Sequence, residues 1–164
     1  MRSRRQPQLD LRLNAATPDA AARWHDGASI AYLGGTLRLM LSGEYAEATQ
    51  VSGALYLPLP PQAMPRQIQD CAEAWLRAEA VRHLTRLINE KSVLATRRTP
   101  RLALSFASRD HWIEAPDANT LRCHWRLIEQ PPAIIDSAIG RALASLTNTT
   151  AATADCDLFA LPSC

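Results

Sequence analysis

Three residues of this sequence have side chains suited to binding a metal ion: His111, Cys123 and His124. Imidazole nitrogens and thiolate sulfurs are the ligands that zinc prefers in proteins. Cys123 and His124 are neighbours on an expected strand, so their side chains point to opposite faces of a sheet. Only one of them can join His111, so a zinc site here remains an alternative to ordinary packing.

Ser145, His111 and Asp136 supply the residue types of a Ser–His–Asp hydrolase. Such enzymes usually hold the serine in a Gly-x-Ser-x-Gly turn, which this sequence lacks. A phosphate-binding P-loop and a Gly-x-Gly-x-x-Gly motif are also missing from the sequence. The sequence therefore does not favour a serine hydrolase or a nucleotide-binding fold of these kinds.

Two segments have the apolar spacing of amphipathic helices, residues 65–90 and 133–146. Pro65 and the Pro131-Pro132 pair suit the first turns of these helices. Charged residues fall on the far side of the first helix, and we expect that side to be a solvated face. These charged residues are Glu73, Arg77, Glu79, Arg82 and Arg86.

Strand patterns surround the first helix and lead to the second. Residues 29–41 predict a hairpin that turns at Gly34-Gly35, and 54–59, 102–106 and 120–125 predict further strands. We expect an α+β fold with an antiparallel sheet packed beside the two helices. Residues 1–23 are expected to be a flexible N-terminal segment, 24–146 the folded domain and 147–164 a C-terminal tail.

Segments 26–30 (DGASI), 75–80 (WLRAEA) and 125–132 (WRLIEQPP) carry a family resemblance. In this order they resemble motifs of the YgjP-like family, which are metal-dependent hydrolases of the zincin-like metallopeptidase type. Trp112 and Trp125 are thirteen residues apart, as two tryptophans are in that family. The resemblance implies a zincin-like pair of helices. We expect Trp75, Trp112 and Trp125 to be buried scaffold residues.

The resemblance also locates the family's zinc-binding HExxH motif, which starts sixteen residues after the second tryptophan. That position is Arg141, and Ala142 and Ser145 stand at the positions of the general base and the second histidine. Arginine cannot lose its proton to become a metal ligand, and alanine offers no functional group. The resemblance therefore implies a catalytically degenerate scaffold with no catalytic residue and no cofactor.

The resemblance places Trp112, Glu114 and Asp155 near the cleft of the old zinc site. We expect the Arg141 guanidinium to take the place of zinc and pair with Glu114 or Asp155, because a buried lone charge is costly. Otherwise Arg141 stays in water and offers an anion-binding point for a partner. The alternative function is a hydrolase, either a peptidase or a nucleotide phosphohydrolase, with a relocated zinc site at His111, Cys123 and His124.

Composition limits the partners of the chain. The formal net charge is only +2, so nucleic acid is not an expected partner, and no apolar run approaches the roughly 20 residues of a membrane helix. The four cysteines lack Cys-x-x-Cys spacing, and no secretory signal is visible. We expect a cytoplasmic, bacterial protein without a membrane anchor that binds an unknown protein partner or self-associates.

Overall fold

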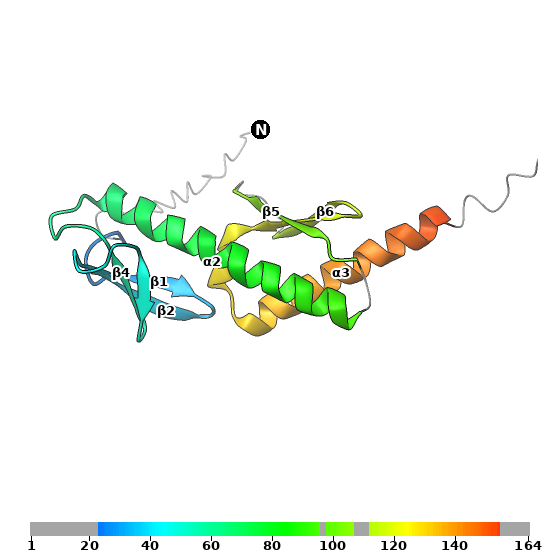
Figure 1. The fold of residues 1–164 in the computed structure, drawn as a ribbon, viewed down its shortest axis with the longest axis horizontal. Coiled ribbons are helices and arrows are strands. Elements are labelled where there is room, and N and C mark those ends of the chain that lie inside the picture. Colours follow the sequence, from blue (N-terminus) through cyan, green and yellow to red (C-terminus); the bar gives the residue numbers. More distant parts are fainter. Residues whose placement is uncertain (1–22, 96–97, 107–111, 155–164) are drawn as a thin grey trace, which may run out of the picture.

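The computed structural model describes residues 23–95, 98–106 and 112–154, with side chains described as far as Leu146. Two small sheets and two long helices make up this part of the chain, which confirms the predicted α+β class (Figure 1). His111 and Asp155 lie outside the described residues.

The first sheet has the strand order β1-β2-β4-β3. Its strands are β1 (Ser29–Tyr32), β2 (Gly35–Leu41), β3 (Thr49–Val51) and β4 (Ala54–Leu57). β1 and β2 form the expected antiparallel hairpin, whereas β2 and β4 pair in parallel. Leu39, Leu55 and Leu57 are fully buried on this sheet and form the first half of the core.

The second sheet has the order β5-β7-β6. Its strands are β5 (Arg101–Ser105), β6 (Ile113–Asp117) and β7 (Thr120–His124). β5 pairs in parallel with β7, and β6 pairs antiparallel with β7. The prediction of an antiparallel sheet was therefore wrong in detail. Each sheet is therefore mixed, with one parallel pair. In the sequence, another strand lies between the two partners of that pair: β3 between β2 and β4, and β6 between β5 and β7.

Helix α2 (Pro65–Leu94) has 30 residues and runs past both sheets (Figure 1). At a rise of about 1.5 Å per residue it is roughly 45 Å long, which lets one element join the two halves of the core. Its buried residues include Ile68, Leu76, Leu84 and Ile88. This helix was expected from its periodicity over residues 65–90, and it continues to Leu94.

One part of the expected solvated face of α2 is buried. Glu73 and Glu79 are only 8% and 5% exposed. Glu79 accepts a hydrogen bond from the Tyr32 hydroxyl (3.2 Å) and pairs with Arg82. A buried carboxylate needs such partners to offset its desolvation. The prediction of a solvated face was therefore wrong at Glu73 and Glu79, because β1 and the segment after β7 cover them.

The chain continues from β7 into the 3-10 helix η1 (Trp125–Glu129) and helix α3 (Pro132–Ala154). The hairpin turn between β1 and β2 packs onto this junction. The Leu33 amide donates to the Ile128 carbonyl (2.8 Å), and Gly34 has a φ of 76°. A Cβ atom on Gly34 would lie 2.8 Å from the Cα of Pro131, so only glycine fits this close approach.

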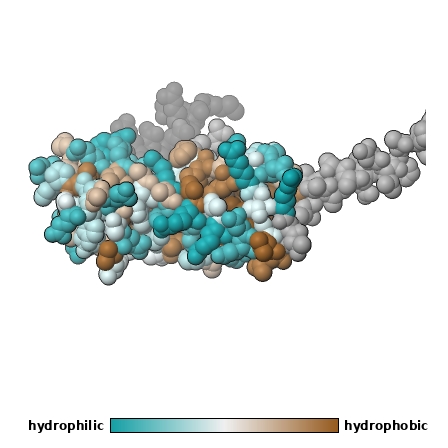
Figure 2. Space-filling model, viewed as in Figure 1, coloured by the Kyte–Doolittle hydropathy of each residue, from teal (hydrophilic) through white to brown (hydrophobic). Residues whose placement is uncertain are grey.

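Helix α3 contacts β6 and α2, and its residues Ile135, Ile139 and Leu143 are buried in the core. The helix was expected to end at 146 and instead runs to Ala154. Among the described residues, no helix combines the length and apolarity needed to cross a membrane. The face drawn in Figure 2 is mainly hydrophilic, with smaller apolar areas among the hydrophilic ones.

Candidate functional site

One pocket lies between α3 and β6, where the sequence placed the degenerate zinc motif. We call it the Arg141 pocket. It has a volume of about 350 Å3 and brings together four of the predicted site residues: Trp112, Arg141, Ala142 and Ser145. Ile113, Ala115 and Ala138 complete its lining. Residues 138, 142 and 145 lie three and four apart on α3, so they share one face of the helix.

The polar groups of the Arg141 pocket are few. Arg141 is exposed and forms no ion pair with another described residue. The Ser145 hydroxyl donates to the Ala142 carbonyl (2.7 Å), a local bond within the helix. Glu114, the expected partner of Arg141, does not line the pocket and pairs with Arg122 on β7 at 3.6 Å. The predicted Arg141–Glu114 pair is therefore not formed.

Trp112 is an exposed residue of the Arg141 pocket. It is 46% exposed, and its ring forms a T-shaped pair with the His124 ring, with 5.8 Å between the ring centres. The prediction that Trp112 is a buried scaffold residue was wrong, because Trp112 comes immediately before β6, at the edge of the second sheet. Trp125 is buried as predicted, at 5%, and Trp75 is partly buried.

The described residues of the Arg141 pocket do not fit a zinc ion. Among them is no histidine, cysteine or carboxylate, which are the ligands that zinc requires. Over the described ranges, no cluster of three or more such side chains is arranged to hold a metal. Among the described lining residues, the exposed Arg141 guanidinium is the only cationic group.

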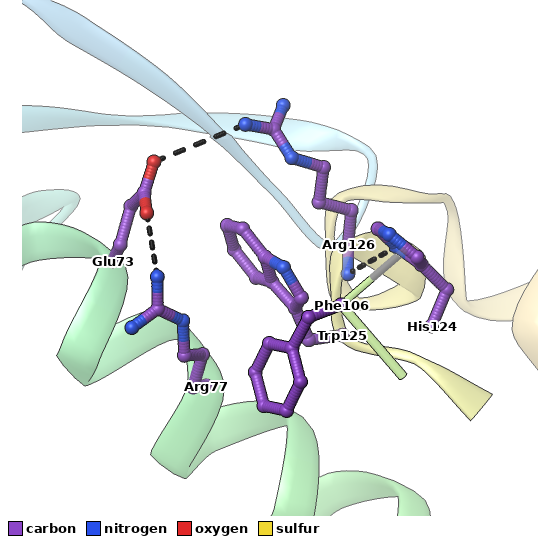
Figure 3. Close-up of a pocket in the computed structure, with 6 residues that line it drawn as sticks. All are labelled: Glu73, Arg77, Phe106, His124, Trp125 and Arg126. Carbon is purple, nitrogen blue, oxygen red and sulfur yellow. Dashed lines mark hydrogen bonds and ion pairs between the residues drawn. The ribbon is translucent and has the colours of Figure 1, made fainter. Parts of the chain in front are cut away.

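A second pocket of about 480 Å3 lies between α2 and the junction of β7 with η1, and we call it the Trp125 pocket (Figure 3). Glu73 and Arg77 come from α2, where they pair at 2.7 Å. Arg126 approaches the same carboxylate from the other side at 3.9 Å. The remaining lining residues are Phe106, His124 and Trp125.

Both arginines of the Trp125 pocket lie over the buried indole. The Arg126 and Arg77 guanidinium carbons are 4.9 Å and 5.3 Å from the centre of the Trp125 ring. Arg77 also lies 5.7 Å from the centre of the Phe106 ring. These cation–π contacts orient both guanidinium groups. The indole and Glu73 therefore hold two cations in this pocket.

His124 contributes a neutral imidazole to the Trp125 pocket. Its Nδ1 accepts a hydrogen bond from the backbone amide of Arg126 (3.2 Å), so the ring proton is on Nε2. Burial lowers the pKa of His124 below the usual value for imidazole, and the charge of Arg126 lowers this pKa further. Nε2–H is therefore available as a donor near neutral pH.

The comparison with protein families identifies the scaffold. The model of the YgjP-like metallopeptidase domain matches residues 5–139. The chain belongs to the YgjP-like family. The match covers most of the 164 residues and ends two positions before Arg141. No curated protein and no solved structure is similar enough to match the chain.

Several residues that carry the family resemblance hold this YgjP-like scaffold together. The Asp26 carboxylate accepts the Leu41 amide (2.9 Å), and Gly27 has a φ of 80°. Trp75 packs against the Tyr32 ring at 5.3 Å. Arg77, Trp125 and Arg126 form the Trp125 pocket, a cluster that the sequence analysis did not find. The signal was present in the Glu73–Arg77 spacing of four residues, but Arg126 lies far away in the sequence.

The structure describes two residues of the alternative zinc site, Cys123 and His124. No described residue of this YgjP-like chain completes a group of three possible ligands with them. Cys123 is fully buried, and burial raises the pKa of its thiol to about 12, which disfavours the thiolate that zinc binds. His124 faces the Trp125 pocket through the contacts above, and His111 is outside the described residues. For the serine-hydrolase alternative, Asp136 pairs with Lys91 at 2.8 Å, and Ser145 bonds within its helix.

Proposed function

We propose that this protein is a catalytically degenerate YgjP-like scaffold that acts by binding, with the Arg141 pocket as its binding site. The observation that carries the proposal is the lining of that pocket. Trp112, Arg141, Ala142 and Ser145 line it together, and no zinc ligand is among the lining residues that the structure describes. The HExxH register inferred from the sequence puts these α3 residues at the positions of the zinc ligands and the general base.

The chemistry of the pocket indicates what it binds. The Arg141 guanidinium is a permanent cation with several N–H donors, and it suits a carboxylate. Trp112 and the apolar residues beside it suit an aliphatic group next to that carboxylate. We therefore infer that the ligand is an acidic side chain flanked by apolar residues, on a partner protein or on a second copy of this chain.

The proposal includes two wider inferences. The binding unit lies in residues 24–146, where the sequence resemblance is found. The protein is a bacterial, cytoplasmic one, in which Cys71 and Cys123, both free in the structure, stay reduced. The alternative of a hydrolase with a relocated zinc site gains no support from Cys123, whose thiol is buried and protonated.

A binding experiment tests the proposed ligand class. The probe is an acetylated, amidated peptide with an aspartate between two leucines, and the readout is the NMR signal of the Trp112 indole N–H. We expect the peptide to shift this signal and Arg141→Ala to weaken binding about tenfold or more. Arg122→Ala is the matched control, because Arg122 is an exposed arginine outside the pocket, and it should bind as the parent does.

Two results would contradict the proposal. The first is peptide binding that is equal in the parent and in Arg141→Ala. The second is turnover of peptide or nucleoside-triphosphate substrates that zinc restores after treatment with a chelator. Such turnover would show that the protein is a hydrolase with its metal elsewhere.

A further inference from the structure

The Trp125 pocket contains a cation whose donors are largely unused. Arg126 approaches Glu73 at 3.9 Å and Glu129 at 3.8 Å, distances of ion pairs without hydrogen bonds. Its guanidinium makes no hydrogen bond to another described residue. The side chain is 37% exposed, so an incoming molecule can reach it. An oxygen anion could therefore form hydrogen bonds that the protein itself does not supply.

The charges of the pocket favour an anion. Arg77 and Arg126 carry two positive charges, and Glu73 is the only carboxylate among the described lining residues. Glu73 already has a hydrogen bond from Arg77 at 2.7 Å and another from Gln69 at 2.9 Å. The described lining residues therefore carry a net positive charge, and the neutral His124 adds a ring N–H donor beside Arg126.

The pocket also has an open aromatic face. Trp125 is buried near the two guanidinium groups, but Phe106 is 62% exposed. Figure 3 shows Arg77 and Arg126 on different sides of the Trp125 ring, and Arg77 also lies near the Phe106 ring. An exposed phenyl ring at the wall of a cavity is a surface on which another planar ring can stack.

We propose that the Trp125 pocket is a second binding site, for a small molecule in which a carboxylate or phosphate is attached to an aromatic ring. Arg126 and His124 receive the anionic group, and the aromatic ring stacks on Phe106. The cavity of about 480 Å3 is in the size range of small-molecule sites. None of its residues lines the Arg141 pocket, so this inference stands apart from the proposed function.

Four probe molecules distinguish the contribution of the aromatic ring to binding from that of the anionic group. Benzoate and phenyl phosphate carry both a ring and an anion, whereas inorganic phosphate lacks the ring and benzyl alcohol lacks the charge. We expect benzoate or phenyl phosphate to shift the Trp125 indole N–H signal with a Kd near or below about 1 mM. Inorganic phosphate and benzyl alcohol should each bind at least about tenfold more weakly. Whichever aromatic anion binds more tightly identifies the anionic group.

Three variants test the assigned roles. Arg126→Gln should weaken binding of the aromatic anion about 10- to 100-fold, the usual effect of losing a hydrogen bond to a charged group. Phe106→Ala should weaken it about three- to tenfold, and because Phe106 is exposed this variant keeps the fold. Arg122→Gln, an exposed arginine on β7, is the control and should bind unchanged.

Any of three results overturns the inference. They are no shift with either aromatic anion, equal affinity for inorganic phosphate and the aromatic anions, or unchanged binding in both Arg126→Gln and Phe106→Ala. The first would show that the arginine–tryptophan cluster only stabilises the fold. Arg141→Ala should leave this binding unchanged, which separates it from binding at the Arg141 pocket.

Discussion

The two pockets of this YgjP-like chain differ in how far their residues depend on one another. In the Trp125 pocket, Glu73, Arg77 and Arg126 share ion pairs around a buried indole. In the Arg141 pocket, Arg141 and Ser145 lie exposed on one side of α3. A change in the first pocket breaks several contacts, whereas a change in the second breaks few. The proposed function makes use of this contrast, because the positions that it assigns to the lost metal site lie where a substitution disturbs few contacts.

The two tryptophans give the largest test of this contrast. Trp125→Ala should lower the free energy of unfolding by about 3–5 kcal/mol, because it leaves a cavity in the core and removes the support of two guanidinium groups. Trp112→Ala should lower it by less than about 1 kcal/mol, because Trp112 is half exposed. Urea unfolding of both variants measures the difference. Equal losses would show that the two pockets do not differ in this way.

The turn that packs against the start of α3 gives the next largest effect. Gly34→Ala should cost about 1–3 kcal/mol, because alanine is strained at this positive φ and its Cβ would press on the Pro131 backbone. Gly43→Ala is the matched control, since a Cβ there meets nothing within 4 Å. The melting temperatures of the two variants give the comparison. A Gly34→Ala protein as stable as Gly43→Ala would contradict the packing of this turn.

The smallest expected effect is a dependence on pH at His124. Burial and Arg126 lower the pKa of His124 in the folded state, whereas the unfolded chain has a value near 6.5. The unfolded state therefore binds more protons as the pH falls below about 6.5, and stability decreases. In His124→Asn the amide oxygen can still accept the Arg126 backbone N–H, but this source of acid destabilisation is gone.

Urea unfolding at several values of pH from neutral to mildly acidic tests the His124 prediction. The parent should lose more stability than His124→Asn over this interval. Burial also lowers the pKa of His83, so the variant keeps the part of the pH dependence that comes from His83. An identical loss of stability in the parent and in His124→Asn would mean that His124 titrates normally in the folded protein.

The sequence predicted the elements of the fold better than their pairing. Periodicity located both helices, because an apolar stripe every 3.6 residues is a local signal. β6 was missed, because Pro116 and Asp117 within it are typical turn residues. The parallel pairings were also missed, because each joins two strands that are separated in the sequence by another strand. A local pattern does not encode such a pairing.

The candidate sites were also predicted only as far as local spacing in the sequence allows. The spacing from Trp125 indicated Arg141, Ala142 and Ser145, which do line one pocket with Trp112. Neither the exposure of Trp112 nor the pairing of Glu114 with Arg122 followed from that spacing, since both depend on where the edge of the second sheet lies. The Trp125 pocket joins α2 to η1 across some fifty residues, so only the folded structure reveals it.

The most direct test of the central claim is zinc binding by the parent and by a variant that restores the motif. Arg141→His, Ala142→Glu and Ser145→His together place two imidazoles four residues apart on α3 and a glutamate between them. Calorimetry should then show zinc binding by the triple variant at least about tenfold tighter than by the parent. The opposite result, one tightly bound zinc per parent chain and no gain in the variant, would show that the Arg141 pocket is not the former zinc site.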